Sequence, residues 1–179
     1  MPALLARATL SVTKGDVVKT ILLATDGSPS AQAATVEAIE LASATGWSLR
    51  VLTVWQTPIL TSFGYAPAVY DPKLTELEKE HATEVAQRAA ALAHEAGLEA
   101  TVEVRQGFPA DEICAVVAES QAQLVVLGAH GWGAFKRLVF GSVSNAVLNH
   151  ATSPVLIVRM TEPEDAEPAT HASAASVTQ

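Results

Sequence analysis

Residues 124–144 read LVVLGAHGWGAFKRLVFGSVS, and they are the most informative part of the sequence about the fold. It begins with a continuous apolar run, Leu124 to Leu127, and such a run is typical of a strand that is buried on both faces. A glycine-rich loop follows as far as Gly141, and a short helix is predicted from Ser142 to His150. A buried strand that leads through a loop into a helix is the repeating unit of α/β proteins with a parallel sheet.

The same alternation of strand and helix extends along the chain from this stretch. Further strands are predicted at residues 20–24, 49–54, 100–104 and 155–158, and further helices at about residues 29–45, 71–97 and 108–120. Strict alternation favours one parallel sheet with right-handed crossovers and with helices on both faces. The connection at residues 55–70 is longer than usual, which is common in loops that take part in function.

The bulk composition limits the classes of function. The chain has 179 residues and a formal net charge of -8 at pH 7. This charge argues against nucleic acid as the main partner, because binding to a duplex rests largely on neutralised phosphates. No apolar run approaches the ~18 residues that cross a membrane. The sequence has one cysteine, Cys114, so no intramolecular disulfide can form, which fits a reducing, cytoplasmic location. Cys114 is expected to be a small buried hydrophobe.

We expect one folded domain with two irregular ends. Residues 1–18 are interpreted as an N-terminal extension, residues 19–160 as the domain and residues 161–179 as a disordered acidic tail. The tail is rich in Glu, Pro, Ala, Ser and Thr, so it cannot bury enough apolar surface to offset the entropy of ordering it.

The glycine-rich loop has the features of a phosphate site. Gly128, Gly131 and Gly141 let the backbone approach a ligand without an intervening Cβ. The first N–H groups of the helix that begins at Ser142 form an anion site, and the hydroxyls of Ser142 and Ser144 add donors beside them. The spacing alone fits turn glycines and an N-capping serine equally well. A P-loop and a dinucleotide fingerprint are disfavoured, since the sequence has no Gly-Lys pair and its glycines read G-x-x-G-x-G.

Residues 128–158 resemble the C-terminal half of a universal stress protein (UspA-like) domain of the ATP-binding subgroup. The family pattern G-x2-G-x9-G-[S/T] is matched at Gly128, Gly131, Gly141 and Ser142. The turns at residues 24–28 and 107–109 are similar too, so the resemblance extends over about residues 19–160. One departure is Gln123, where the family commonly has Asp, at the end of the strand that is farther from the loop.

The resemblance implies a flavodoxin-like, Rossmann-like open five-stranded sheet of order 3-2-1-4-5, in which the first and fourth strands are neighbours. Ligands bind at such a switch point, beyond the carboxyl ends of the strands. The site residues that it implies are Ala24, Asp26, Val54, Leu127, Gly128, His130, Gly131, Gly141, Ser142, Val143 and Ser144.

The resemblance also implies a role for each part of the site. The backbone of Val54 faces the adenine edge, and Asp26 faces the ribose or a phosphate-bound Mg²⁺. Ala24 and Leu127 pack near the nucleoside, and the loop glycines, His130 and residues 141–144 surround the ribose and phosphates. Trp55 and Trp132 are candidates for stacking on the adenine ring. For Trp132 we rather expect that it packs its loop against its own helix or a partner subunit. Lys136 and Arg137 either screen phosphate charge or are solvated.

These features predict an ATP-binding protein, with Mg²⁺, that has a regulatory or stress-response role and an unidentified protein partner. The alternatives are a weak ATPase or nucleotidyl transferase, a sensor of AMP or cyclic AMP, and an interaction module that is independent of nucleotide. No catalytic base is identified, and no metal site built from protein ligands alone is expected. The apolar strand Val155–Val158 is predicted at an edge of the sheet, where it favours a homodimer.

Overall fold

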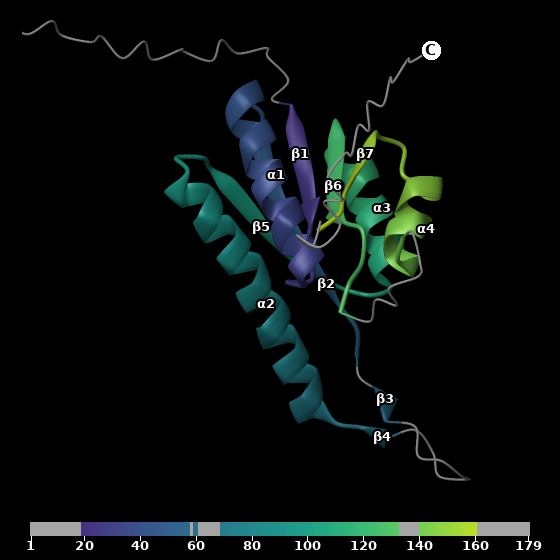
Figure 1. Cartoon of the computed structure of the whole chain (residues 1–179). Helices are drawn as coiled ribbons and strands as arrows, with labels where there is room; N and C mark the ends of the chain where they lie inside the picture. Colours follow the sequence, from purple (N-terminus) through teal and green to yellow (C-terminus); the bar gives the residue numbers. More distant parts are fainter. Residues whose placement is uncertain (1–18, 58, 61–68, 133–139, 161–179) are drawn as a thin grey trace, which may run out of the picture.

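Five strands pair in parallel at the centre of the computed structural model, which describes residues 19–57, 59–60, 69–132 and 140–160 (Figure 1). The predicted extension and tail, together with Lys136 and Arg137, lie outside these residues. The sheet consists of β1 (Thr20–Ala24), β2 (Ser48–Trp55), β5 (Ala100–Gln106), β6 (Leu124–Gly128) and β7 (Val155–Val158). The strand order is β5-β2-β1-β6-β7, which confirms the predicted order 3-2-1-4-5.

Helices cover both faces of the sheet (Figure 1). Helices α1 (Pro29–Thr45) and α2 (Pro72–Glu95) pack on one face, and α3 (Pro109–Ser120) and α4 (Ser142–His150) pack on the other. Since successive side chains of a strand point to opposite faces, Ile21 and Leu23 of β1 join the core under α1 and α2, whereas Leu22 joins the core under α3. All three are fully buried, as expected for a central strand between two helical layers.

The ends of α1 follow from local sequence signals. The hydroxyl of Ser28 accepts a hydrogen bond from the backbone N–H of Ala31, and Pro29 occupies the first turn, where no intrahelical N–H bond is lost. Gly46 ends the helix in the left-handed conformation, with φ of 71°, which glycine adopts without steric cost. Both boundaries agree with the prediction.

Three features differ from the prediction. Strands β2 and β5 extend beyond their apolar runs as far as Trp55 and Gln106, because the parallel register continues through these two paired residues. The long connection contains a short antiparallel pair, β3 (Ile59–Leu60) with β4 (Val69–Tyr70), and two-residue strands leave no periodic signal in a sequence. Cys114 is only partly buried, so its interpretation as a core residue is wrong.

The end of the sheet at which β1 and β6 begin is closed by Gln123, the residue that departs from the family pattern. Its side-chain Oε1 accepts a hydrogen bond of 2.6 Å from the backbone N–H of Thr20, and its own N–H donates to the Thr20 carbonyl at 2.9 Å. The opposite end is open, since β1 continues into α1 on one face and β6 leads to α4 on the other. Gln123 therefore ties the start of β6 to the start of β1, and it lies away from the open end of the sheet.

Candidate functional site

A cavity of about 370 Å³ lies at the open end, where the carboxyl ends of β1 and β6 are adjacent. Its lining comes from the ends of β1, β2 and β6 and from the starts of α1, α3 and α4. All of the site residues that the sequence implied line this one cavity: Ala24, Asp26, Val54, Leu127, Gly128, His130, Gly131, Gly141, Ser142, Val143 and Ser144. The topology thus brings the β1 turn and the glycine-rich loop together.

One side of the cavity is apolar. Leu52 and Val54 of β2 lie two residues apart on the same face of the sheet, and Ile113 of α3 approaches from above that face. Sequence reasoning missed several lining residues, namely Thr25, Ala31, Leu52, Pro109, Ile113 and Ala129. The period of two along a strand would have found Leu52 once Val54 was assigned.

The other side of the cavity is the N-terminus of α4. Gly141 precedes this helix and supplies no capping side chain, so the first N–H groups of α4 have no partner from a cap. The hydroxyl of Ser144 is buried and donates toward the carbonyl oxygens of Ala129 (2.9 Å) and Gly141 (3.0 Å), which holds the loop and the helix together. The hydroxyl of Ser142 is exposed and has no hydrogen-bond partner among the described residues. The proton of Ser144 is therefore engaged, and Ser142 carries the available hydroxyl.

The glycine-rich loop is fixed to the start of α1 by two serine hydroxyls. Ser28 donates to the carbonyl oxygen of His130 at 3.2 Å, and Ser30 donates a shorter bond to the same oxygen. The N–H of His130 in turn points to the Ser30 hydroxyl at 3.2 Å. A Cβ on Gly128 would lie 2.6 Å from Ser30 Oγ and 2.7 Å from the backbone N of Ala31, so the contact requires glycine. Sequence reasoning identified Ser28 only as a helix cap and did not single out Ser30.

Asp26 belongs to the turn that follows β1, and its side chain lies beside the glycine-rich loop. Its Oδ1 accepts a hydrogen bond of 3.0 Å from the N–H of Ser28, and its Oδ2 accepts no hydrogen bond within the described part of the chain. A Cβ on Gly131 would lie 2.6 Å from this Oδ2, so the glycine keeps the oxygen accessible beside the loop.

The two tryptophans that the sequence offered as stackers do not line the cavity. The indole N–H of Trp132 donates a hydrogen bond of 3.0 Å to the backbone oxygen of Asp26, and its side chain is 69% exposed. Trp132 is thus held to the β1 turn by a hydrogen bond, and its exposed side chain leaves the expected contact with a partner subunit untested. Trp55 is the last residue of β2.

Asp26 is the one acidic residue among the described residues that line the cavity. Nowhere in the described ranges do three or more His, Cys, Asp or Glu side chains gather as a set that could hold a metal ion. None of the described helices is both long enough and apolar enough to cross a membrane. A metal at this cavity would therefore take most of its ligands from the bound molecule or from water.

The model of the universal stress protein family matches residues 18–159, which is most of the chain. This chain belongs to the universal stress protein family. The match includes every strand and helix of the described fold.

Individual members of the universal stress protein family agree with this assignment. The universal stress protein YxiE of Bacillus subtilis is 32% identical over 144 residues, which cover 78% of this chain and 97% of that protein. The solved structure of UspA from Lactobacillus plantarum matches with a TM-score of 0.68 and 28% identity, covering 79% of this chain and 98% of that one.

One solved universal stress protein of the same fold contains a nucleotide. The protein from Archaeoglobus fulgidus was solved in complex with dAMP and matches with a TM-score of 0.57 and 22% identity, covering 78% of this chain and 97% of that one. At this identity the likeness establishes the shared fold.

Proposed function

We propose that this chain binds ATP, together with Mg²⁺, in the cavity at the carboxyl ends of β1 and β6, and that nucleotide occupancy regulates its interaction with a protein partner. The observation that carries the proposal is the division of one cavity into an apolar side and a side built from amides and glycines. A nucleoside polyphosphate has the same division between its base and its phosphates.

The start of α4 and the glycine-rich loop are suited to the phosphates. Uncapped N–H groups at the start of a helix carry the positive end of its dipole and bind anions. The exposed hydroxyl of Ser142 supplies a further donor, while the Ser144 bond to Ala129 keeps the loop against the helix. Gly141 leaves the approach to these amides free of a side chain.

The apolar side is suited to the nucleoside. Ala24 and Leu127, paired across β1 and β6, and Val54 of β2 offer aliphatic contacts for the base and ribose. The cavity volume of about 370 Å³ falls within the usual range for sites that bind small molecules. The archaeal relative whose structure contains dAMP supports an adenine nucleotide as the class of ligand.

The carboxylate of Asp26 is suited to a phosphate-bound Mg²⁺. Its Oδ1 is committed to the Ser28 N–H, whereas its Oδ2 lies beside Gly131 without a hydrogen bond from the described residues. Protein sites usually bind Mg²⁺ through one or two carboxylates plus substrate phosphates and water. One available carboxylate oxygen therefore fits Mg²⁺ that arrives with ATP.

The assignment is tested by thermal unfolding and calorimetry of the purified chain. A ligand that binds only the native state stabilises it by about 2.7 kcal/mol at one hundred times its Kd, so ATP with Mg²⁺ raises the melting temperature. We expect a smaller rise with GTP, because the proposal assigns recognition of the adenine edge to backbone groups at Val54. Equal shifts with ATP and GTP would contradict the adenine assignment.

Parallel titrations separate the alternatives. Tighter binding of AMP or cyclic AMP than of ATP would favour a sensor of those nucleotides. Absence of binding for all of them would favour an interaction module that is independent of nucleotide. Rapid ATP turnover would favour an enzyme, whereas we expect slow turnover or none, because we identify no catalytic base among the described residues that line the cavity. Mass analysis of the small molecule that copurifies with the chain identifies the physiological ligand.

We also propose that the chain forms a homodimer through β7. This strand occupies one edge of the sheet, each of its residues is only partly buried in the single chain, and its sequence VLIV carries no charge. The opposite edge strand, β5, carries Glu103 and Arg105, and charged residues protect an edge against further pairing. A twofold axis would pair β7 with β7 of a second copy in an isologous contact.

A further inference from the structure

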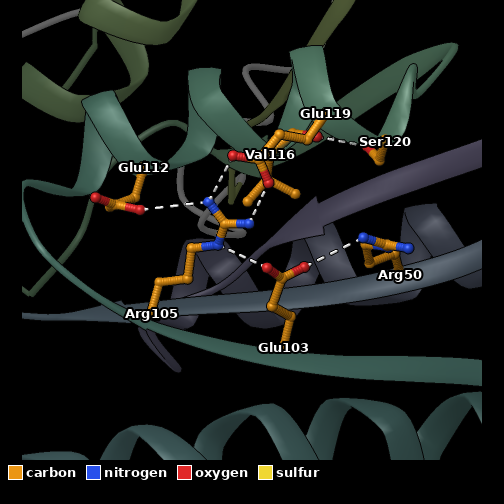
Figure 2. A network of polar contacts seen from close by, with 7 residues as sticks. All are labelled: Arg50, Glu103, Arg105, Glu112, Val116, Glu119 and Ser120. Carbon is orange, nitrogen blue, oxygen red and sulfur yellow. Dashed lines mark hydrogen bonds and ion pairs between the residues drawn. The ribbon is translucent and has the colours of Figure 1, made fainter.

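A group of five charged side chains lies outside the cavity, between β2, β5 and α3 (Figure 2). The guanidinium of Arg105 is at its centre. Its Nε donates to Glu103 at 2.6 Å, one terminal nitrogen lies 3.5 Å from Glu112, and both terminal nitrogens bind Glu119. Arg50 completes the group from β2 with a 3.3 Å bond to the other oxygen of Glu103.

Arg105 attaches α3 to the edge strand at two points. Glu112 and Glu119 are seven residues apart, which places them on one side of the helix about two turns from each other. Val116 lies between them and is fully buried in the core below α3. Two attachments along one helix restrain its tilt as well as its distance from the sheet, which a single ion pair does not do.

The same attachment joins two walls of the cavity. In the register of β2 with β5, Leu52 is opposite Glu103 and Val54 is opposite Arg105. Leu52 and Val54 line the cavity from the sheet, and Ile113, next to Glu112 on α3, lines it from the helix. Arg105 therefore connects β5, which pairs with the cavity-lining strand β2, to α3, which lines the cavity from the other side.

The chemistry of the group favours arginine at this position. The planar guanidinium presents its N–H donors in a fixed fork, which lets one side chain bind Glu119 with both terminal nitrogens while Nε binds Glu103. A lysine ammonium is a point charge and cannot hold three carboxylates in this geometry. The hydrogen bond from Arg105 lowers the pKa of Glu119, so this pair is ionised at neutral pH.

We propose that Arg105 is a positioning residue for the nucleoside end of the cavity. By holding α3 to β5, it sets the spacing between the helix wall, Pro109 and Ile113, and the strand floor, Leu52 and Val54. This inference rests on the proposed nucleotide binding. It predicts that Arg105 governs recognition of the nucleoside and leaves recognition of the phosphates at α4 unchanged.

The test compares Arg105→Gln and Arg105→Lys with Arg50→Gln, which removes a charge whose direct partner is Glu103 of β5 and which acts on Glu119 of α3 only through longer-range electrostatics. Calorimetry measures Kd for ATP, for GTP and for inorganic tripolyphosphate. We expect Arg105→Gln to raise the Kd for ATP about fivefold or more and to reduce the preference for ATP over GTP. Arg105→Lys should give a smaller rise, and Arg50→Gln should match the wild type. Tripolyphosphate should bind all four proteins equally.

Hydrogen exchange without ligand gives an independent readout of the attachment. Amides 112–117 of α3 should exchange faster in Arg105→Gln than in Arg50→Gln, because α3 loses its restraint to β5. If Arg105→Gln does not fold, Glu119→Gln, which removes one attachment and keeps the shape of the side chain, takes its place in both measurements.

The outcomes distinguish the two proposals. A wild-type chain that binds no nucleotide overturns the proposed function. A wild-type chain that binds ATP, with the same Kd for Arg105→Gln and Arg50→Gln, overturns the role of Arg105 alone. Equal losses for ATP and tripolyphosphate, or unchanged exchange in α3, also overturn it.

Discussion

The hydroxyl of Ser30 donates a hydrogen bond to the carbonyl oxygen of His130, 100 residues further along the chain. The same hydroxyl accepts a hydrogen bond from the N–H of His130, so one serine binds both backbone groups of a single loop residue. This contact fixes the glycine-rich loop to the start of α1. The loop therefore owes its position to helix α1 as well as to the strand before it.

Replacing Ser30 by alanine should release the loop. Loss of a buried hydroxyl that serves two backbone groups should cost about 1–3 kcal/mol of folding stability, because the N–H of His130 loses this acceptor and its carbonyl loses one of two serine donors. ATP should also bind more weakly. Urea unfolding and calorimetry measure the two effects. The control is Ser120→Ala, which removes a hydroxyl bonded only within α3. Equal ATP affinity in the two variants would show that the contact is not needed for binding.

Gly128→Ala should destabilise the fold by about 1–3 kcal/mol through overpacking. Two of the three nearest atoms to the added Cβ, at 2.7 Å each, belong to the backbone of Ser30 and Ala31, which cannot rotate away. For this reason, adding Ser30→Ala should not restore stability. Thermal unfolding of the single and double variants decides the point, and a double variant as stable as Ser30→Ala alone would contradict it.

Gly141→Val should abolish ATP binding while the fold persists. Gly141 has a φ of -70°, which other residues adopt, and a Cβ there would lie 3.3 Å from the Ala129 oxygen. Gly141→Ala should therefore need only a shift of a few tenths of an ångström and affect binding less, whereas the branched valine obstructs the amides of α4. Calorimetry supplies the Kd, and circular dichroism verifies the fold. Wild-type affinity in Gly141→Val would identify this glycine as a turn residue only.

The Arg105–Glu119 pair should make stability depend on pH. The bond from Arg105 lowers the pKa of Glu119 below its ordinary value of 4.5, so the unfolded chain takes up the proton first as pH falls. The stabilisation is complete above the ordinary pKa and is lost as pH falls through the lowered one. Urea unfolding should show the wild type more stable than Glu119→Gln at pH 7 and equal to it at the lowest pH. A difference that persists in acid would point to another cause.

Lysine in place of Ile157 should break the β7 dimer. The charge would lie in an apolar edge strand, so light scattering at micromolar concentration should show monomers or aggregates. Because Ile157 also packs against the core under α3 and α4, circular dichroism must show that the fold persists. The control is Val102→Lys on the opposite edge strand, β5, where the side chain is already 43% exposed. A wild-type monomer would refute the dimer, and a dimer that survives Ile157→Lys would place the interface elsewhere.

The sequence predicted the fold well because its signals are local. The apolar runs, the cap at Ser28 and the stop at Gly46 each act within one element, and the order of the strands then followed from the family resemblance. The residues implied for the site do line one cavity, although their binding of nucleotide is still a prediction.

What the sequence could not supply were contacts that depend on how elements approach one another. The bonds of Ser30 to His130 and of Arg105 to Glu119 join segments whose spacing carries no pattern. The hydrogen bond of Trp132 depends on such an approach too. A large aromatic residue is usually buried, but here a single polar partner, the Asp26 carbonyl, orients it while most of the side chain remains exposed.

The hydrogen bond from Trp132 to Asp26 also gives the molecule an intrinsic optical reporter. The fluorescence of an indole depends on its immediate surroundings, and the N–H of this indole donates to the backbone of the β1 turn. The other two tryptophans, Trp47 and Trp55, are partly shielded and belong to the sheet or to its entry. A change in this fluorescence, measured against the signal of Trp47 and Trp55, would therefore register separation of the glycine-rich loop from the β1 turn in the unlabelled protein.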